Sequence, residues 1–304
     1  MSRYVIDKKL LDENIEIVKQ KAGVPLIGVV KGNGYGFGIR EITKILVEHG
    51  IKTFAVTEVT DLPILREVLT YEDILVMRST CIKDECREIA KYGATATIGS
   101  LQAGQAMSEV ATEMGVTVKC HLKIDTGMGR YGFMPSEIEN AIKCYSLPNL
   151  EFTGAYTHFS SAFRNHELTK AQLEMFKDTM AKIKEKVENV GILHASNSPA
   201  LLNVEDVCLD TVRIGSAFTG RVITKSKSGL HRLGSLEAEV VDVKTVPKGY
   251  FVGYNATYQT KRETKIAIVP IGHYDGFGLT KEKELITFRY VLSVFKSFLK
   301  KKQM

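Results

Sequence analysis

The sequence predicts an α/β protein: a (β/α)8 barrel of the TIM type, followed by a smaller β-rich C-terminal domain. Strand-like apolar runs alternate with amphipathic, helix-like stretches, as repeated βα units require. The strand-like runs are nearly continuously apolar, which is typical of parallel strands covered by helices on both faces. Eight such units follow one another within about two hundred residues, which favours a closed barrel over an open sheet.

The predicted barrel strands are, in chain order, residues 25–31, 53–57, 73–78, 95–99, 117–125, 152–159, 192–197 and 211–217. Helical spacing of apolar residues is clearest in residues 39–49, 82–92, 101–114, 135–144 and 168–190. Because the helix-like stretches fall between the strands, we assign residues 1–222 to the barrel.

After residue 222 the pattern changes. Residues 236–246 and 250–271 are strand-like, with a turn between them, so we assign residues 223–304 to a β-rich second domain. Residues 1–9 could pack on that domain. Residues 285–302 have helical spacing and end in lysines. We expect their apolar stripe to serve packing or a dimer contact rather than membrane anchoring.

Composition and charge narrow the class of protein. The chain has 304 residues, 44% hydrophobic and 25% charged, which is ordinary for a soluble globular protein. Its net charge of +6 is mild and is a weak argument for nucleic-acid binding. The five cysteines are scattered without metal or redox spacing, so we expect reduced thiols and no metal site. Since neither a membrane span nor a signal peptide is recognisable, we expect a cytoplasmic protein with no membrane or nucleic-acid partner.

The segment around Lys31 is the most informative. It reads Val-Val-Lys-Gly-Asn-Gly-Tyr-Gly-Phe-Gly from Val29 to Gly38, a lysine between an apolar strand and a glycine-rich turn. A lysine amine can form a Schiff base with an aldehyde, above all with pyridoxal phosphate (PLP). The glycines let backbone amides approach a phosphate, which Tyr35 could hydrogen-bond. Taken alone, the segment is explained as well by a surface lysine beside a tight turn.

Polar side chains gather at or just past the ends of the predicted strands, where the chemistry of such barrels lies. They are Lys31, Lys123, Asp125, Arg130, His158, Asn197, Ser198 and Arg213. Polar residues commonly follow strands, and this alone would explain the position of any one of these residues. It does not explain why several cations and several groups suited to bind phosphate occur together. Asn197 and Ser198 also precede a helix, whose N-terminus is a natural phosphate site.

Three blocks, in this order, resemble the alanine racemase family of fold-type III PLP enzymes: residues 31–38, residues 125–130 and the tyrosine block 254–258. The resemblance runs from about residue 9 to about residue 277. It implies that Lys31 holds PLP covalently. The phosphate-binding residues it implies are Tyr35, Ser198, Gly215 and Ser216, with Asn197 beside them. It places Arg213 at the pyridine nitrogen, His158 behind Arg213, and Arg130 near the phenolic oxygen of PLP and the substrate.

The implied reaction is racemisation of a small amino acid, with L-alanine to D-alanine as the leading interpretation. A single base cannot reach both faces of the planar aldimine, so Lys31 and Tyr254 would serve as base and acid on opposite faces. Tyr254 would reach the site of the neighbouring subunit in a homodimer. Arg213 cannot accept a ring proton, which argues for a racemase, because decarboxylases of this barrel type use a carboxylate there.

Several alternatives remain open. The chain could be a serine or broad-specificity racemase, a PLP-binding barrel with little or no turnover, or a PLP decarboxylase or aldolase. Lys123 matches a lysine that many family members carry as a carbamate orienting Arg130, or it pairs unmodified with Asp125. The second domain lacks a segment usual in the family, and His273 stands where a tyrosine is usual, so we expect this domain to be truncated.

Overall fold

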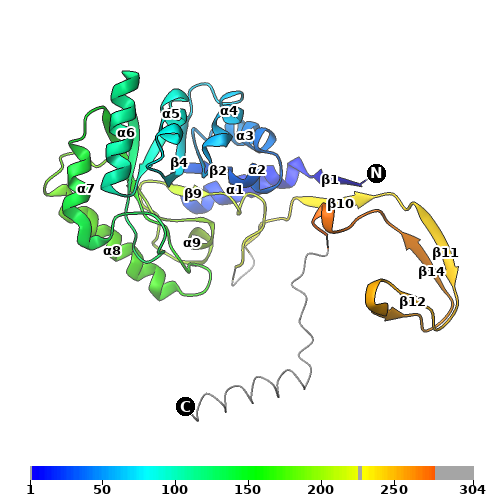
Figure 1. Cartoon of the computed structure of the whole chain (residues 1–304). Helices are drawn as coiled ribbons and strands as arrows, with labels where there is room; N and C mark the ends of the chain where they lie inside the picture. The colour runs from blue at the N-terminus through cyan, green and yellow to red at the C-terminus, as the bar shows by residue number, and fades with distance from the viewer. Residues whose placement is uncertain (1, 225–227, 278–304) are drawn as a thin grey trace, which may run out of the picture. The chain divides into compact units, whose positions relative to one another are not determined.

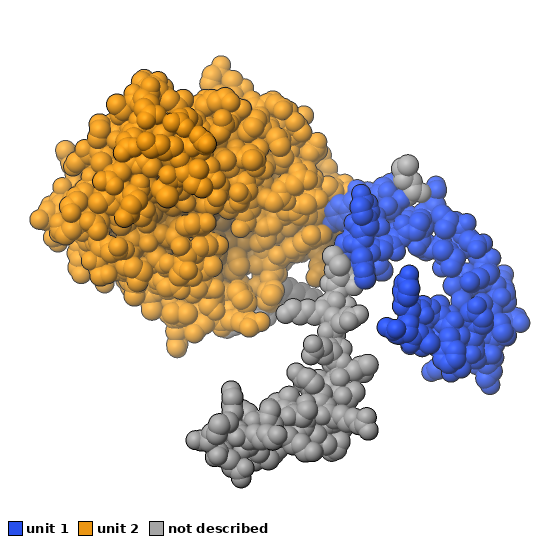
Figure 2. Space-filling view, viewed as in Figure 1, with its two compact units in different colours: residues 1–5, 235–304 blue, residues 6–234 orange. Residues whose placement is uncertain are grey.

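The computed structural model describes residues 2–224 and 228–277, which form two compact units (Figures 1 and 2). One unit consists of residues 6–234, and the other combines residues 1–5 with the chain after Gly234. The division into separate domains after residue 222 stays a prediction.

The larger unit is the predicted (β/α)8 barrel. Its strands are β2 (Leu26–Val29), β3 (Thr53–Val56), β4 (Asp73–Ser79), β5 (Thr95–Ile98), β6 (Val118–Lys123), β7 (Leu150–Tyr156), β8 (Ile192–His194) and β9 (Val212–Ile214). They form one eight-stranded parallel sheet in the order β8-β7-β6-β5-β4-β3-β2-β9. A bridge between His194 and Thr211 joins β8 to the start of β9 and closes the circle.

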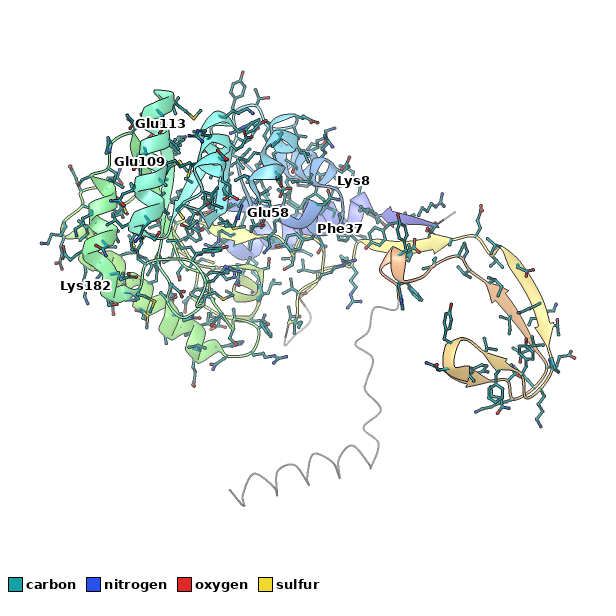
Figure 3. The ribbon with its side chains drawn as sticks, viewed as in Figure 1. Lys8, Phe37, Glu58, Glu109, Glu113 and Lys182 are labelled. Carbon is teal, nitrogen blue, oxygen red and sulfur yellow. The ribbon has the colours of Figure 1, made fainter. Side chains whose placement is uncertain are left out.

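Helices surround this sheet, as the alternating pattern predicted (Figure 1). They are α1 (Lys8–Ala22), α2 (Lys31–Tyr35), α3 (Ile39–Glu48), α4 (Leu62–Arg66), α5 (Lys83–Lys91), α6 (Leu101–Met114), α7 (Ile138–Tyr145), α8 (His166–Lys184) and α9 (Ser198–Asn203). Short 3₁₀ segments occur at Val59–Asp61 and Pro135–Glu137. On the outer surface, α6 carries Glu109 and Glu113 (Figure 3). Lys83 of α5 lies 2.8 Å from Glu109 and 3.9 Å from Glu113. Exposed pairs of this kind add little stability.

All the predicted barrel strands except 73–78 were too long at their carboxyl ends. His158 and Asn197, predicted inside strands, lie beyond β7 and β8, and Lys31 begins α2 instead of ending β2. The predicted helix 168–190 begins at His166 and ends at Lys184. The apolar pattern continues past each strand because the residues there are still buried, although they have left the hydrogen-bonded ladder.

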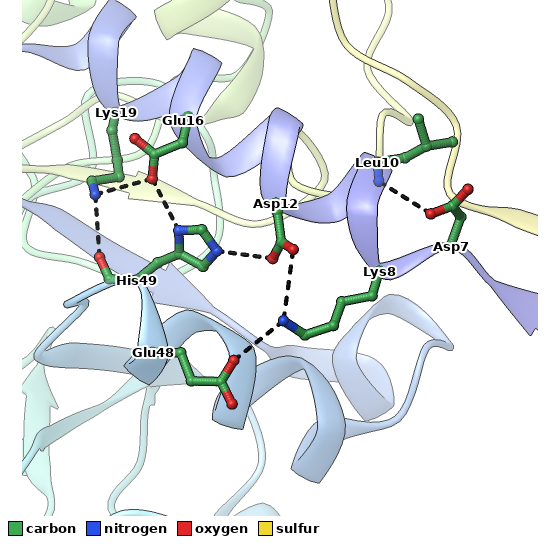
Figure 4. A network of polar contacts seen from close by, with 8 residues as sticks. All are labelled: Asp7, Lys8, Leu10, Asp12, Glu16, Lys19, Glu48 and His49. Carbon is green, nitrogen blue, oxygen red and sulfur yellow. Dashed lines mark hydrogen bonds and ion pairs between the residues drawn. The ribbon is translucent and has the colours of Figure 1, made fainter.

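A polar network ties α1 to the end of α3 (Figure 4). Both ring nitrogens of His49 lie 2.9 Å from carboxylates, Nε2 from Asp12 and Nδ1 from Glu16. Lys8 contacts both Asp12 and Glu48. A neutral imidazole has only one N–H, so both contacts are hydrogen bonds only when His49 is protonated. His49 lowers the pKa of both Asp12 and Glu16 through these hydrogen bonds.

Asn14 of α1 is fully buried and joins this helix to the segment of the same unit that follows β9. Its Nδ2 donates to the carbonyls of Phe218 and His231, and its Oδ1 accepts the amide of His231. Asn14→Ala should lower the free energy of unfolding by about 3 kcal/mol, because these buried backbone groups would lose their partners. Urea denaturation tests this, with the exposed Lys9→Ala on the same helix as control. An equally small change in the free energy of unfolding of both variants would contradict the role assigned to Asn14.

The second unit is β-rich, as predicted. β1 (Ser2–Ile6) pairs with β10 (Gly234–Ala238), β11 (Asp242–Val246) with β14 (Thr264–Ile268), and β12 (Phe251–Val252) with β13 (Tyr258–Gln259). The predicted long strands are interrupted, one between β10 and β11 and the other by the 3₁₀ segment Tyr254–Ala256. Gly253 and Asn255 have positive φ there, which ends a strand. A further 3₁₀ segment spans His273–Asp275. The predicted helix 285–302 lies outside the described residues.

Among the helices described, none combines the length and apolarity that crossing a membrane requires.

Candidate active site

A cavity of about 300 Å³ lies at the carboxyl ends of the barrel strands. Many of its lining residues are those that the sequence singled out. They are Lys31, Tyr35, His158, Asn197, Ser198, Arg213, Gly215 and Ser216. These side chains come from segments that follow β2, β7 and β8 and from β9 with its continuation. The barrel therefore gathers at one place residues that are far apart in the sequence.

Lys31 is held at the cavity by a turn of left-handed backbone. Gly32, Asn33 and Gly34 have φ of 61°, 53° and 62°, and the Asn33 side chain accepts the amide of Ile39. This conformation costs little at glycine and asparagine, which explains the composition of the turn. Burial, and then the charge of Arg130, lower the pKa of the Lys31 amine from its ordinary value. A larger fraction of the amine is therefore free to act as a nucleophile near neutral pH.

Tyr35, Ser198 and Gly215 form a tight cradle in the cavity wall. A Cβ on Gly215 would lie 2.4 Å from the Tyr35 hydroxyl, so only glycine fits beside this ring. The Ser198 hydroxyl oxygen accepts the amides of Gly215 and Ala217, each at 3.2 Å. Its own O–H remains as a donor toward the cavity. Burial raises the pKa of Tyr35 to about 12, so its phenol also stays a donor.

The two terminal nitrogens of Arg213 donate to neutral acceptors. Its NH1 donates to Nδ1 and to the carbonyl of His194, at 2.8 and 3.2 Å. Its NH2 donates to the carbonyls of Thr157 and Ala195 and lies 3.4 Å from Nδ1 of His158. Burial lowers the pKa of Arg213 to about 10, which still leaves it charged at neutral pH. Within the described residues no carboxylate pairs with it, so its charge is available to a bound group.

The histidines around Arg213 are uncharged. Burial, and then the charge of Arg213, lower the pKa of His158 to about 2 and that of His121 to about 4. The same causes lower the pKa of His194 well below its ordinary value. His194 Nδ1 accepts from Arg213, so its Nε2 carries the proton and donates to His121 Nδ1 at 2.9 Å. This chain fixes the tautomer of His194 and the orientation of Arg213.

Asn197 connects the cavity to α9. Its Oδ1 accepts the amide of Ala200 and caps the helix, while its Nδ2 lies 3.4 Å from Nε2 of His158. The side chain is therefore fixed in one orientation.

Lys123 and Arg130 do not belong to the cavity lining, although both act on it. The Lys123 amine is buried and lies 4.1 Å from the centre of the Tyr156 ring, with the Arg213 guanidinium 4.9 Å from the same centre. Burial, and then Arg213 and Arg130, lower the pKa of Lys123 well below its ordinary value. In the described chain no ion pair joins Lys123 to Asp125, whose oxygens accept backbone amides instead.

Tyr254 belongs to the smaller unit, in the 3₁₀ segment Tyr254–Ala256, and its side chain is exposed. Its predicted role at the active site of a neighbouring subunit stays a prediction.

Other cavity residues were not predicted. Met77, Met128, Phe159 and Phe163 add apolar walls. No sequence pattern distinguishes them, because apolar residues near strand ends resemble residues of the hydrophobic core. His121 and Tyr156, which contact the network behind Arg213, could have been found. Each lies two residues before a predicted site residue, Lys123 and His158 respectively, and alternate residues of a strand share a face.

Comparisons with known proteins agree with this geometry. Residues 6–222 match the sequence family described as alanine racemase, N-terminal domain, and residues 233–289 match alanine racemase, C-terminal domain. An alanine racemase of Methanococcus maripaludis is 33% identical over 281 residues, covering 90% of this chain and 75% of the relative. The solved alanine racemase of Clostridium difficile 630 is 29% identical, with a TM-score of 0.85 over 91% of this chain and 74% of that one.

A further solved relative shows the same fold. The alanine racemase of Bartonella henselae, described with covalently bound pyridoxal phosphate, is 24% identical, with a TM-score of 0.80 over 90% of this chain and 76% of that one.

Proposed function

Because the chain belongs to the alanine racemase family, we propose that it is a PLP-dependent isomerase that interconverts L- and D-alanine. The observation that carries the proposal is the convergence, in one cavity, of a half-buried lysine of lowered pKa, an anion cradle and an unpaired arginine cation. The free cysteines support a reducing, cytoplasmic location.

The cavity residues fit PLP, the cofactor of this family. Lys31 supplies the amine for the aldehyde. The cradle of Tyr35, Ser198 and Gly215 supplies hydroxyl and amide donors for the phosphate, and glycine leaves room for close approach. Several cations and few carboxylates surround the cavity, which suits a ligand with negative charge.

When bound, PLP withdraws electrons from the substrate and makes its α-proton acidic. The chain must remove that proton and return one to the opposite face. The Lys31 amine, with its lowered pKa, can take or give a proton at the α-carbon. Arg213 is oriented by His194 and remains a cation, so it can donate a hydrogen bond to the ring nitrogen but cannot transfer a proton to it. With an unprotonated ring nitrogen the cofactor would be a weaker electron sink, so the residues of the site would return the proton to the α-carbon quickly.

For the opposite face we propose Tyr254 of the neighbouring subunit in a homodimer. The support is its exposed phenol, free for contact with a second chain, and the need of racemisation for a group on each face.

The test is to incubate the purified chain with PLP and a panel of L-amino acids and to analyse the products by chiral chromatography. We expect D-alanine to form fastest. Faster formation of D-serine would identify serine as the preferred substrate, and comparable rates for many amino acids would identify a broad-specificity racemase. PLP binding without any D-product would point to a binding protein, and release of carbon dioxide or of glycine to a lyase.

We also propose that Lys123 carries a carbamate. Its amine is buried beside two arginines and forms no ion pair with a carboxylate in the described chain, and its lowered pKa leaves it free to add carbon dioxide. The product is an anion, which would pair with Arg130 and remove the repulsion among the cations. Native mass spectrometry should show the mass of carbon dioxide in bicarbonate-equilibrated protein and its loss in Lys123→Met. An unmodified mass in bicarbonate would refute the carbamate.

A further inference from the structure

We propose that Asp125 is a positioning residue, whose carboxylate shapes residues 125–130 into a fixed loop that holds Met128 in the cavity wall and Arg130 near enough for its charge to act on the site. The inference concerns how the proposed active site is built and therefore rests on the proposed function for its catalytic consequence.

The two oxygens of Asp125 accept three backbone amides. Oδ1 lies 2.9 Å from the amide of Gly127 and 2.7 Å from that of Met128, while Oδ2 lies 3.0 Å from that of Arg130. Burial raises the pKa of Asp125, but these amides outweigh it, so the pKa lies below its ordinary value. The carboxylate thus stays ionised at neutral pH, and charged acceptors make the stronger hydrogen bonds.

The base of the loop is anchored independently of this carboxylate. The amide of Asp125 donates to the carbonyl of Phe133, and the amide of Phe133 donates to Lys123, both at 2.9 Å. Gly132 has a φ of 124°, and a Cβ there would lie 2.6 Å from the amide nitrogen of Asp125. The carbonyl of Thr126 accepts the side chain of Gln172 at 3.0 Å. Loss of the carboxylate contacts should therefore loosen residues 127–130 without unfolding the strand ends.

Two residues of this loop, Met128 and Arg130, affect the active site. Met128 lines the cavity. The charge of Arg130 contributes to the lowered pKa of Lys31, His158 and Lys123, so its guanidinium lies close enough to act on all of them. A group that acts by its charge at short range must be held in place. Oδ2 of Asp125 accepts the backbone amide of Arg130 and so holds this residue.

Asp125→Asn tests the proposal, since the amide side chain keeps its volume and Oδ1 but presents an N–H where Oδ2 accepted. The measurement is the pKa of Lys31 in the cofactor-free chain, by competitive acetylation and mass spectrometry of its peptide. The direction of the change in the pKa of Lys31 distinguishes a positioning role of Asp125 from a direct charge effect. Removing a nearby negative charge would by itself lower the pKa of Lys31, whereas displacing the Arg130 cation raises it. We expect a rise, together with a severalfold higher KM for alanine and a smaller change in kcat.

Two controls separate positioning from general damage. Asp210→Asn removes a carboxylate that accepts the amide of Leu193 at 2.7 Å, before β9 begins, and should leave the pKa of Lys31 unchanged. In an Arg130→Gln background, Asp125→Asn should no longer raise the pKa of Lys31, because Arg130 is already gone. An unchanged or lowered pKa in the folded Asp125→Asn protein, or a rise that persists without Arg130, would overturn the proposal.

One measurement needs no variant. Hydrogen exchange of the wild-type chain should show protected amides at Met128 and Arg130, and rapid exchange at both would also overturn the proposal. If the wild type does not racemise alanine, the function fails, yet the pKa of Lys31 and the exchange rates still decide the role of Asp125.

Discussion

Lys31→Ala should abolish both covalent attachment of PLP and racemisation. No other described lysine lines this cavity, so no second amine can take over. Because the same group holds the cofactor and moves a proton, we expect a fall in kcat of about 10⁴-fold or more. Activity can be followed by chiral chromatography, and attachment by mass spectrometry after borohydride reduction.

The control is Lys182→Ala, which removes an exposed lysine near the end of α8 that does not line the cavity (Figure 3). It should keep full activity and the reduced PLP adduct. A PLP adduct that survives in Lys31→Ala, or that maps to another peptide in the wild type, would show that the attachment site is assigned wrongly.

Tyr254→Phe should reduce racemisation by about 10²–10⁴-fold, the usual contribution of a positioned acid or base. The equilibrium constant between enantiomers is one, so kcat/KM must fall equally in both directions. The loss of an acid or base on one face only should instead make the rates of α-proton exchange differ between the two enantiomers. In deuterium oxide, the variant should still exchange the α-proton of one enantiomer, through Lys31, and lose exchange of the other.

Tyr258→Phe is the matched control, since it removes another exposed phenol of the same unit and should leave both exchange rates unchanged. Normal turnover in Tyr254→Phe would show that a different group serves the second face.

The sequence predicted the parts of the site that depend on strand ends. Lys31 and His158 each follow an apolar run, and parallel strands bring such ends together. Arg213, predicted at a strand end, lies instead in the middle of β9 (Val212–Ile214). The sequence also predicted the site around Gly215, because a position where another group must come close to the backbone requires small residues. It could not predict which polar groups pair. An ion pair with Asp125 was one of two roles left open for Lys123, but the carboxylate of Asp125 accepts amides of its own loop, a choice that depends on the local backbone conformation.

The second unit was predicted less well. Its predicted strand 250–271 is broken where Gly253 and Asn255 adopt positive φ, and an asparagine in the sequence indicates such a turn only weakly. Likewise, the apolar residues Met77 and Phe163 resemble core residues until the cavity is seen.

The most direct test of the account is racemisation of L-alanine by the PLP-loaded wild type in deuterium oxide, sampled early and resolved by chiral chromatography with mass detection. Proton removal by one group and return by another predicts D-alanine that carries deuterium at the α-carbon. Absence of D-alanine, or D-alanine that retains the original proton, would contradict the account.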